Sequence, residues 1–77
     1  MQYDNKIVGQ VIRTAREEKK LSQELLSGFA GIARSHLSMI ESGRKYARLD
    51  TIWKIAAALE ISPSELVARM EQAEDKK

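Results

Sequence analysis

The side chains that could do chemistry in this sequence are polar and cationic, and they gather between residues 34 and 48. Helical spacing of apolar residues predicts a helix over 34–42, and its polar and flexible side chains then share one outward arc. The members of this arc are Arg34, Ser35, Ser38, Met39 and Ser42. Serines let a helix backbone approach a partner closely, whereas arginine and methionine can reach hydrogen-bonding and methyl groups on base edges. The arc therefore fits a nucleic-acid contact, although an ordinary solvated helix would also carry such a face.

A basic loop follows the arc directly. Three of the five residues after Gly43 are cationic, namely Arg44, Lys45 and Arg48. Such side chains in a loop can meet irregularly placed phosphates without helix geometry, although many surface loops are equally basic. Residues 1–48 carry nine Lys/Arg against five Asp/Glu, a net +4, whereas residues 49–77 carry four against six, a net −2. The formal charge of +2 thus conceals a basic front that suits a polyanionic partner.

Catalytic and metal chemistry has few residues to use here. The chain has no cysteine and one histidine, His36, which excludes a thiolate nucleophile and a metal site built from cysteine or a second histidine. No glycine-rich phosphate loop is present, and 77 residues bury one thin core without a deep cleft. We therefore expect no cofactor and no metal, and an enzyme is the least favoured class. The lack of cysteine and of a long apolar run favours a cytoplasmic setting without a signal peptide or membrane span.

Five helices are predicted to hold these residues in place. The first covers about 5–19, with Asp4 or Asn5 as its N-cap. Ser22 is the expected N-cap of a short second helix, and Gly31 ends it as a left-handed turn residue before the 34–42 helix. This is helix-turn-helix spacing. A fourth helix over about 49–59 is expected to be the most buried, so the fold class is all-α, a compact five-helix bundle over residues 1–72 with a polar tail at 73–77.

The last helix begins with a strong signal. Residues 62–65 read Ser-Pro-Ser-Glu, which places a capping serine, a proline at the first helical position and a glutamate at the third, a capping box. An apolar stripe of Leu66, Val67 and Met70 follows, and it exceeds what one peripheral helix needs. Part of the stripe is therefore expected to face a second subunit, although it would equally serve to cover the bundle. Trp53 in the fourth helix is expected in the core or in an interface.

These motifs together resemble a known family. The stretch from Leu21 to Ser62, LSQELLSGFAGIARSHLSMIESGRKYARLDTIWKIAAALEIS, is similar to the lambda-repressor-like (XRE-type) helix-turn-helix family of phage lambda and 434 repressors, Cro and restriction-modification controller proteins. The resemblance rests on Leu-Ser-Gln-Glu opening the second helix, Ala-Gly at the turn, Ile-Glu-x-Gly closing the third helix and Ala-x-x-Leu in the fourth. Each feature is common alone, whereas the spaced set is specific.

The resemblance implies a DNA-binding transcriptional regulator that acts as a homodimer on double-stranded DNA with a near-palindromic operator. The third helix would read the major groove while the second braces it across the backbone. Positions that read bases in the family are occupied here by Arg34, Ser35, Ser38 and Met39. Positions that contact phosphate are occupied by Gln23, His36, Ser42, Arg44, Lys45 and Arg48. Arg16 and Glu41 match a structural ion pair between the first and third helices.

Four positions depart from the family pattern. Ala33 stands where a capping serine or threonine is common, which weakens the start of the third helix by about 1 kcal/mol. Leu25 replaces a usually polar residue and is expected to be exposed at a contact that the sequence does not assign. Ser27 replaces alanine, a mild change, and Ala47 replaces a frequent proline, which leaves the basic loop more flexible.

Two other classes remain open at this point. An antitoxin or accessory protein could use the same DNA-binding fold while the last helix and Trp53 hold a protein partner. A purely protein-binding bundle is the second, and it would show no DNA binding at low salt.

Overall fold

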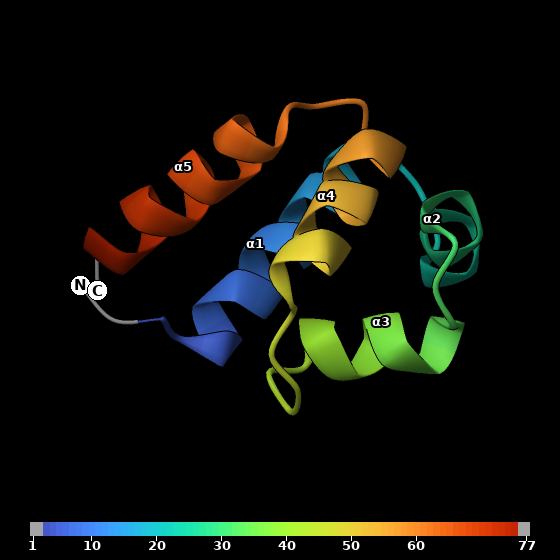
Figure 1. The fold of residues 1–77 in the computed structure, drawn as a ribbon, viewed down its shortest axis with the longest axis horizontal. Helices are drawn as coiled ribbons and strands as arrows, with labels where there is room; N and C mark the ends of the chain where they lie inside the picture. The colour runs from blue at the N-terminus through green and yellow to red at the C-terminus, as the bar shows by residue number, and fades with distance from the viewer. Residues whose placement is uncertain (1–2, 76–77) are drawn as a thin grey trace.

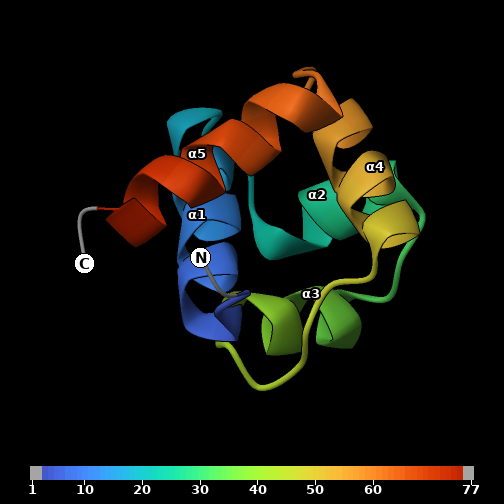
Figure 2. The ribbon, with the colours of Figure 1, turned by 60° about the vertical axis from the view of Figure 1, so that its left-hand side comes forward.

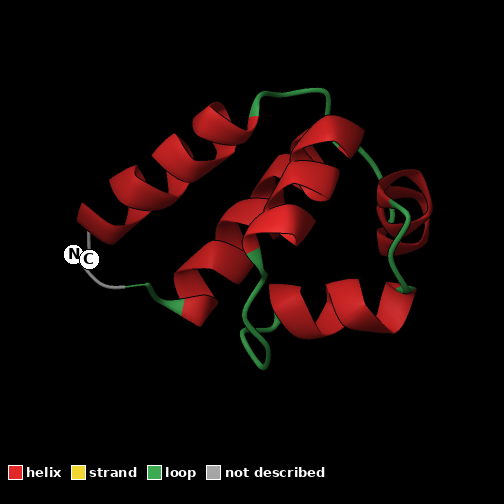
Figure 3. Cartoon of the chain, in the orientation of Figure 1, coloured by secondary structure: helices red, strands yellow, loops and turns green. Residues whose placement is uncertain are grey.

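The computed structural model describes residues 3–75, which form five helices and no strand (Figure 1). The helices are α1 (Asn5–Glu18), α2 (Gln23–Ala30), α3 (Arg34–Glu41), α4 (Leu49–Ala58) and α5 (Pro63–Asp75). Figure 3 shows that short loops join them, the longest of which lies between α3 and α4. The predicted all-α, five-helix fold is therefore confirmed, and the predicted helix bounds differ from the observed ones by a few residues at most. None of the described helices is long and apolar enough to cross a membrane.

Side-chain caps start three of the helices. Asp4, of the two candidates, caps α1, because its carboxylate accepts from the Lys6 amide at 2.9 Å. The Ser22 hydroxyl accepts from the Leu25 amide at 3.0 Å at the start of α2. At α5 the Ser62 hydroxyl accepts from the Glu65 amide at 3.1 Å, while the Glu65 carboxylate accepts from Arg69 at 3.1 Å. The bonds to Asp4, Ser22 and Ser62 satisfy amides that a helix start leaves without partners, whereas the Glu65 carboxylate pairs with a side chain.

Two glycines set how the helices meet. Gly31 has φ = 72°, the left-handed conformation that ends α2, and the Ile32 amide then donates to the Ser27 carbonyl at 3.0 Å. Gly9 lies where α1 crosses α3, and a methyl group there would collide with the carbonyl oxygens of Ile40 and Glu41. The turn thus sets how α2 meets α3, and the crossing brings α3 against α1.

The core lies where the five helices pack against one another. α1 packs against α3 and α5, α2 packs against α3 and α4, and α4 packs against α5. In the views of Figure 1 and Figure 2, α3 and the loop after it lie on the opposite side of the molecule from α5. The largest fully buried side chains come from all five helices or their ends: Ile12, Leu26, Leu37, Ile40, Ile55, Leu59 and Leu66.

The structure corrects the expected roles of several apolar side chains. Leu66 and Met70, expected partly at a subunit interface, are 0% and 7% exposed and belong to the core of the single chain, whereas Val67 is 39% exposed. Leu49 was expected in the most buried helix, yet it is 68% exposed. Trp53, expected in the core or in an interface, is 56% exposed and so lies outside the core, whereas the interface stays a prediction. Helical periodicity shows which residues share a face, but the packing of α4 against α2 and α5 decides which face is covered.

α5 also continues beyond the expected start of the polar tail at residue 73. Ala73 lies partly buried beside Val11 and Thr14 of α1, and Arg69 donates to the Glu18 carboxylate of α1 at 3.0 Å. Packing on α1 therefore holds the last turn helical through Asp75 despite its polar sequence. Residues 76–77 of the expected tail lie outside the described residues.

Candidate nucleic-acid interface

The outward face of α3 carries the side chains that the sequence predicts for base contacts. Arg34 and Ser35 are exposed, whereas Ser38 and Met39 are partly buried in the same surface. The opposite face of the helix is fixed by Leu37 and Ile40, which are fully buried. Ala33 precedes α3 without a side-chain cap bond, so no side chain closes this helix start. α3 is thus held rigidly from behind while its polar face stays accessible.

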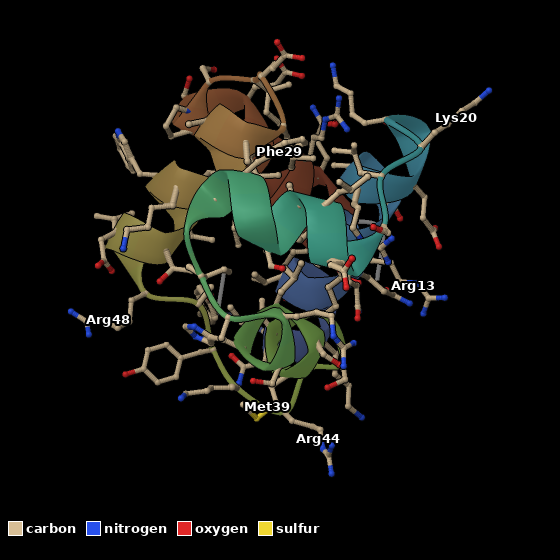
Figure 4. All side chains as sticks on the ribbon, turned by 90° about the vertical axis from the view of Figure 1, so that its right-hand side faces the viewer. Arg13, Lys20, Phe29, Met39, Arg44 and Arg48 are labelled. Atoms are coloured by element: carbon tan, nitrogen blue, oxygen red, sulfur yellow. The ribbon has the colours of Figure 1, made fainter. Side chains whose placement is uncertain are left out.

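The basic loop is folded back onto the end of α3. The Arg44 and Lys45 amides both donate to the Met39 carbonyl, at 3.0 and 3.3 Å, and the Ser42 hydroxyl donates to the same carbonyl at 3.1 Å. Figure 4 shows Arg44 projecting beside Met39, while Arg48 projects toward another side of the molecule. Met39 therefore links the outward face of α3 to the first two loop cations, and Arg48 stands apart from them.

Arg48 also differs in its electrostatic surroundings. Its guanidinium lies 3.5 Å from the Asp50 carboxylate, and both side chains are exposed. Such a pair is weak in water, so a phosphate can compete with Asp50 for the arginine. Arg44 and Lys45 are exposed as well, and the three cations remain candidates for backbone contacts.

A buried polar network ties the start of α2 to α3. Arg16 on α1 donates from Nε to Oε2 of Glu41 at 2.8 Å and from Nη2 to Oε1 at 2.9 Å. Gln23 donates from Nε2 to the same Oε1 at 3.0 Å, and Arg16 Nη1 donates to the Leu21 carbonyl at 2.8 Å. The hydrogen bonds to Glu41 raise the pKa of Arg16, an effect that burial partly opposes. The network places Gln23 beside the C-terminal end of α3.

The remaining predicted phosphate contacts are divided by their exposure. Ser42 is exposed at the C-cap of α3, close to the loop cations. His36 is partly buried on α3, outside the outward arc, and Gln23 is partly buried at the start of α2. The structure therefore groups Gln23, Ser42, Arg44 and Lys45 around one end of α3 and leaves His36 and Arg48 apart.

A further set of side chains on α1 was missed by the sequence analysis. Lys6 packs against Gly43 at the end of α3, and with Gln10 and Arg13 it lines a shallow surface that also includes Ser42. All three α1 residues are exposed, and Arg13 pairs with Glu17 at 3.2 Å. Their spacing of four and three residues marks one helix face, so the sequence held the signal. Only the crossing of α1 and α3 shows that this face borders the basic loop.

Apart from Tyr46 in the loop after α3, the large exposed apolar side chains form two separate areas away from the α3 arc. The first surrounds a cavity of about 300 Å³ whose lining includes Tyr3, Leu49 and Val67, and Trp53 lies next to Leu49 on α4. The second lies on α2, where Leu25 and Phe29 are 49% and 64% exposed at positions i and i+4. The exposure of Leu25 agrees with the expectation from its sequence position.

α2 and α3 are arranged around the Gly31 turn, and α3 packs against α1 and α2 while its polar face stays exposed. This arrangement defines a helix-turn-helix protein of the lambda-repressor-like kind. The chain belongs to the helix-turn-helix family (HTH_3), whose profile matches residues 12–66. Family membership supports the expectation that the chain is a regulator rather than an enzyme.

Named proteins with similar sequences and structures fall in the same group. The restriction-modification controller protein C.AhdI from Aeromonas hydrophila superimposes with a TM-score of 0.79 at 41% identity, over 82% of this chain and 96% of that one. The control protein C.BamHI of Bacillus amyloliquefaciens is 37% identical over 62 residues, covering 79% of this chain and 76% of that protein. An uncharacterised HTH-type transcriptional regulator of Sinorhizobium fredii, y4dL, is 38% identical over 61 residues, which span 79% of this chain but only 31% of that protein.

Proposed function

We propose that the protein is a sequence-specific DNA-binding transcriptional regulator that inserts α3 into the major groove. The observation that carries the proposal is the accessible polar face of α3 bordered by Arg44 and Lys45, in a chain of the helix-turn-helix family. α2 would cross the backbone and hold α3 in register. A DNA target would also fit the cytoplasmic location that the sequence without cysteine favours.

The α3 face divides into base-reading roles by chemistry. Arg34 would donate two hydrogen bonds to the O6 and N7 atoms of a guanine, which is the commonest specific contact of arginine in the major groove. Met39 or Ala33 would contact a thymine methyl group, and Ser35 and Ser38 can donate to or accept from base edges. These four side chains and Ala33 lie at or near the exposed surface of one short helix, so they would read a few adjacent base pairs.

Phosphate contacts would set the register and most of the affinity. Arg44, Lys45 and Arg48 would neutralise phosphates and release counterions, which makes the affinity depend on salt. Hydrogen bonds to phosphates from Ser42, His36 and Gln23 would help to position the helix on the DNA backbone. The exposed Lys6 and Arg13 of α1 extend the same basic edge.

A homodimer would supply the second half-site. Two α3 helices spaced about 34 Å apart, or ~10 base pairs, would match a near-palindromic operator. Because Leu66 and Met70 are used in the core, the dimer contact would fall on Leu49, Trp53 and Val67.

Selection of bound duplexes from a random pool tests the whole proposal in one experiment. Enrichment of a two-fold symmetric sequence with half-sites ~10 base pairs apart is the expected result. The same selection with Arg34→Ala should recover sites that are degenerate at one position per half-site. No enrichment at low salt would contradict sequence-specific binding, whereas enrichment of a single unpaired half-site would contradict the dimer.

An exposed apolar surface on α2 favours a second candidate function. Leu25 and Phe29 expose an apolar area on α2, away from the proposed dimer contact and the α3 face, which suits an antitoxin or accessory protein with a protein partner. Co-purification of a neighbouring-gene product with the wild-type chain, and its loss with Leu25→Gln/Phe29→Gln, would support this alternative. Unchanged DNA binding of that variant is the matched control.

A further inference from the structure

The Tyr3 hydroxyl binds both backbone groups of Ala47, a residue of the loop between α3 and α4. It donates to the Ala47 carbonyl at 3.1 Å and accepts from the Ala47 amide at 3.3 Å, across 44 positions of the sequence. Ala47 is 4% exposed, and buried backbone groups need hydrogen-bond partners. Among residues 3–75, the Tyr3 hydroxyl is the only partner of the Ala47 amide.

The chemistry of tyrosine allows both bonds at once. A phenol hydroxyl carries one donor and also accepts hydrogen bonds. Partial burial raises the pKa of Tyr3, so the hydroxyl keeps its proton at neutral pH and remains a donor. The aromatic ring lines the apolar cavity together with Ala47 and Leu49. The change Tyr3→Phe therefore removes both hydrogen bonds and keeps the ring.

The start of α1 contacts the loop at two places. Tyr3 directly precedes Asp4, which caps α1, and Lys6 in the first turn packs against Gly43 where the loop begins. α1 in turn packs against α3. The loop is therefore held near its beginning by Lys6 and near its end by Tyr3.

Different elements fix the two parts of the loop. α3 fixes the first part, because the Arg44 and Lys45 amides donate to the Met39 carbonyl at 3.0 and 3.3 Å. The second part leads into Arg48, whose side chain is 75% exposed. Between Lys45 and Arg48, Tyr3 makes the only hydrogen bonds to the loop backbone within the described part of the chain.

We propose that Tyr3 is a positioning residue for the phosphate contact of Arg48. Its hydroxyl fixes the backbone next to Arg48 before DNA arrives, so less of the loop has to be ordered when the guanidinium meets a phosphate. Ala47 stands where a proline is frequent, and the bonds to Tyr3 supply a restriction that the missing ring does not. Alanine also keeps the N–H that proline lacks and that the contact with Tyr3 requires. This inference rests on the proposed DNA-binding function.

Amide hydrogen exchange on the free protein tests the contact without DNA. In Tyr3→Phe, exchange of the Ala47 amide should become about 2- to 10-fold faster than in the wild type. The Arg44 and Lys45 amides, which are bonded to the Met39 carbonyl, are controls within the same loop and should not change. Unchanged exchange at Ala47 would overturn the inference, because the hydroxyl would then not hold the loop. An equal rise at all three amides would overturn it as well, because the change would loosen the whole loop.

A double-mutant cycle on DNA affinity tests the coupling to Arg48. Affinities are measured for the wild type, Tyr3→Phe, Arg48→Ala and the double variant, on the selected duplex and on a random one. Tyr3→Phe should weaken binding about 2- to 10-fold on both duplexes, because it acts on a backbone contact. It should add little to the loss in Arg48→Ala. The matched control is Glu18→Leu/Arg69→Met, which removes an exposed ion pair between α1 and α5, keeps the net charge and should leave affinity unchanged.

The oligomeric state is measured alongside, because Tyr3 lines the cavity beside the proposed dimer contact at Leu49 and Val67. Analytical ultracentrifugation should show the same self-association for the wild type and Tyr3→Phe, since the ring is kept. Weaker self-association that accounts for the loss of affinity would overturn the positioning role.

The results of the cycle separate the inference from the proposed function. Additive losses, or full affinity in Tyr3→Phe, would show that Tyr3 does not act through Arg48. Wild-type affinity in Arg48→Ala would overturn the inference too, while the base-reading role of Arg34 would stand on its own duplex-selective loss. Failure of the wild type to bind any duplex would refute the proposed function and the inference with it, even where hydrogen exchange shows that Tyr3 holds the loop.

Discussion

Removal of the Glu41 carboxylate should be among the most damaging single changes in this protein. The Glu41 side chain is 3% exposed and accepts three hydrogen bonds, two from Arg16 and one from Gln23. The Arg16 side chain is 11% exposed, so Glu41→Leu leaves a largely buried guanidinium without its counter-charge. Breaking one side of a buried ion pair costs about 3–5 kcal/mol. A domain of 77 residues has about 4–12 kcal/mol of total stability, so the loss takes a large part of it.

Thermal and urea unfolding followed by circular dichroism measure this loss. For a domain of this size, a loss of about 3–5 kcal/mol corresponds to a fall in Tm of more than about 12 °C. Glu18→Leu is the matched control, because the Glu18 carboxylate pairs with Arg69 at 3.0 Å but is 58% exposed. An exposed pair contributes about 0–1 kcal/mol, so the control should move Tm by only a few degrees.

A second variant distinguishes the loss of an ion-pair partner from the loss of side-chain packing. Arg16→Met/Glu41→Leu removes both charges, and it should recover most of the stability that Glu41→Leu loses. Equal losses for Glu41→Leu and Glu18→Leu would refute the reasoning, because the buried position would then have no electrostatic consequence. A double variant as unstable as Glu41→Leu would show that the loss comes from packing or from the Leu21 carbonyl rather than from an uncompensated charge.

Three other predictions concern α3 and its loop. Arg34→Ala should lose about 1–3 kcal/mol of binding on the selected duplex but little on random DNA, and equal losses in a titration of both would remove Arg34 from the base-reading set. Arg44→Ala should weaken binding to every sequence and reduce the salt slope by about 1 per site, so an unchanged slope would count against its phosphate contact. Ala33→Ser should raise the free energy of unfolding by about 0.5–2 kcal/mol, because Ala33 gives α3 no side-chain cap; an unchanged urea midpoint would contradict this.

The local signals in the sequence were sufficient for the helices and their ends. Ser22 and Gly31 act at single positions, through a hydroxyl acceptor and a left-handed φ, and such effects depend on residue type rather than on distant packing. The errors came where packing between helices decides the outcome. Leu49 shares the apolar character of α4, yet it is 68% exposed because α2 and α5 cover other faces of that helix. The stripe of α5 was similarly divided, with Met70 turned into the core.

The candidate site divides in the same way, into residues that helical spacing predicts and contacts that depend on packing between helices. The outward arc of α3 follows from helical geometry alone, so Arg34 and Met39 could be named from spacing. The hydrogen bond between Gln23 and Glu41 joins residues 18 positions apart, and the contact of Lys6 with Gly43 spans still more of the chain. No periodicity connects such pairs, because they depend on how α1 and α2 cross α3. The DNA-contacting roles of all these residues remain predictions.

The charge asymmetry of the sequence gives the folded protein a basic side and an acidic side. Four carboxylates and one arginine make α5 net negative, and α5 lies across the molecule from α3 and its basic loop (Figure 1). A polyanion would therefore be attracted to one side of the domain and repelled by the other, which would turn α3 toward DNA before any contact forms. This orienting effect acts over roughly one Debye length, about 8–10 Å at ordinary salt. Reversing the charge of exposed acids on α5, such as Glu71→Lys, should thus raise random-DNA affinity at low salt while leaving the preference for the selected duplex unchanged or lower.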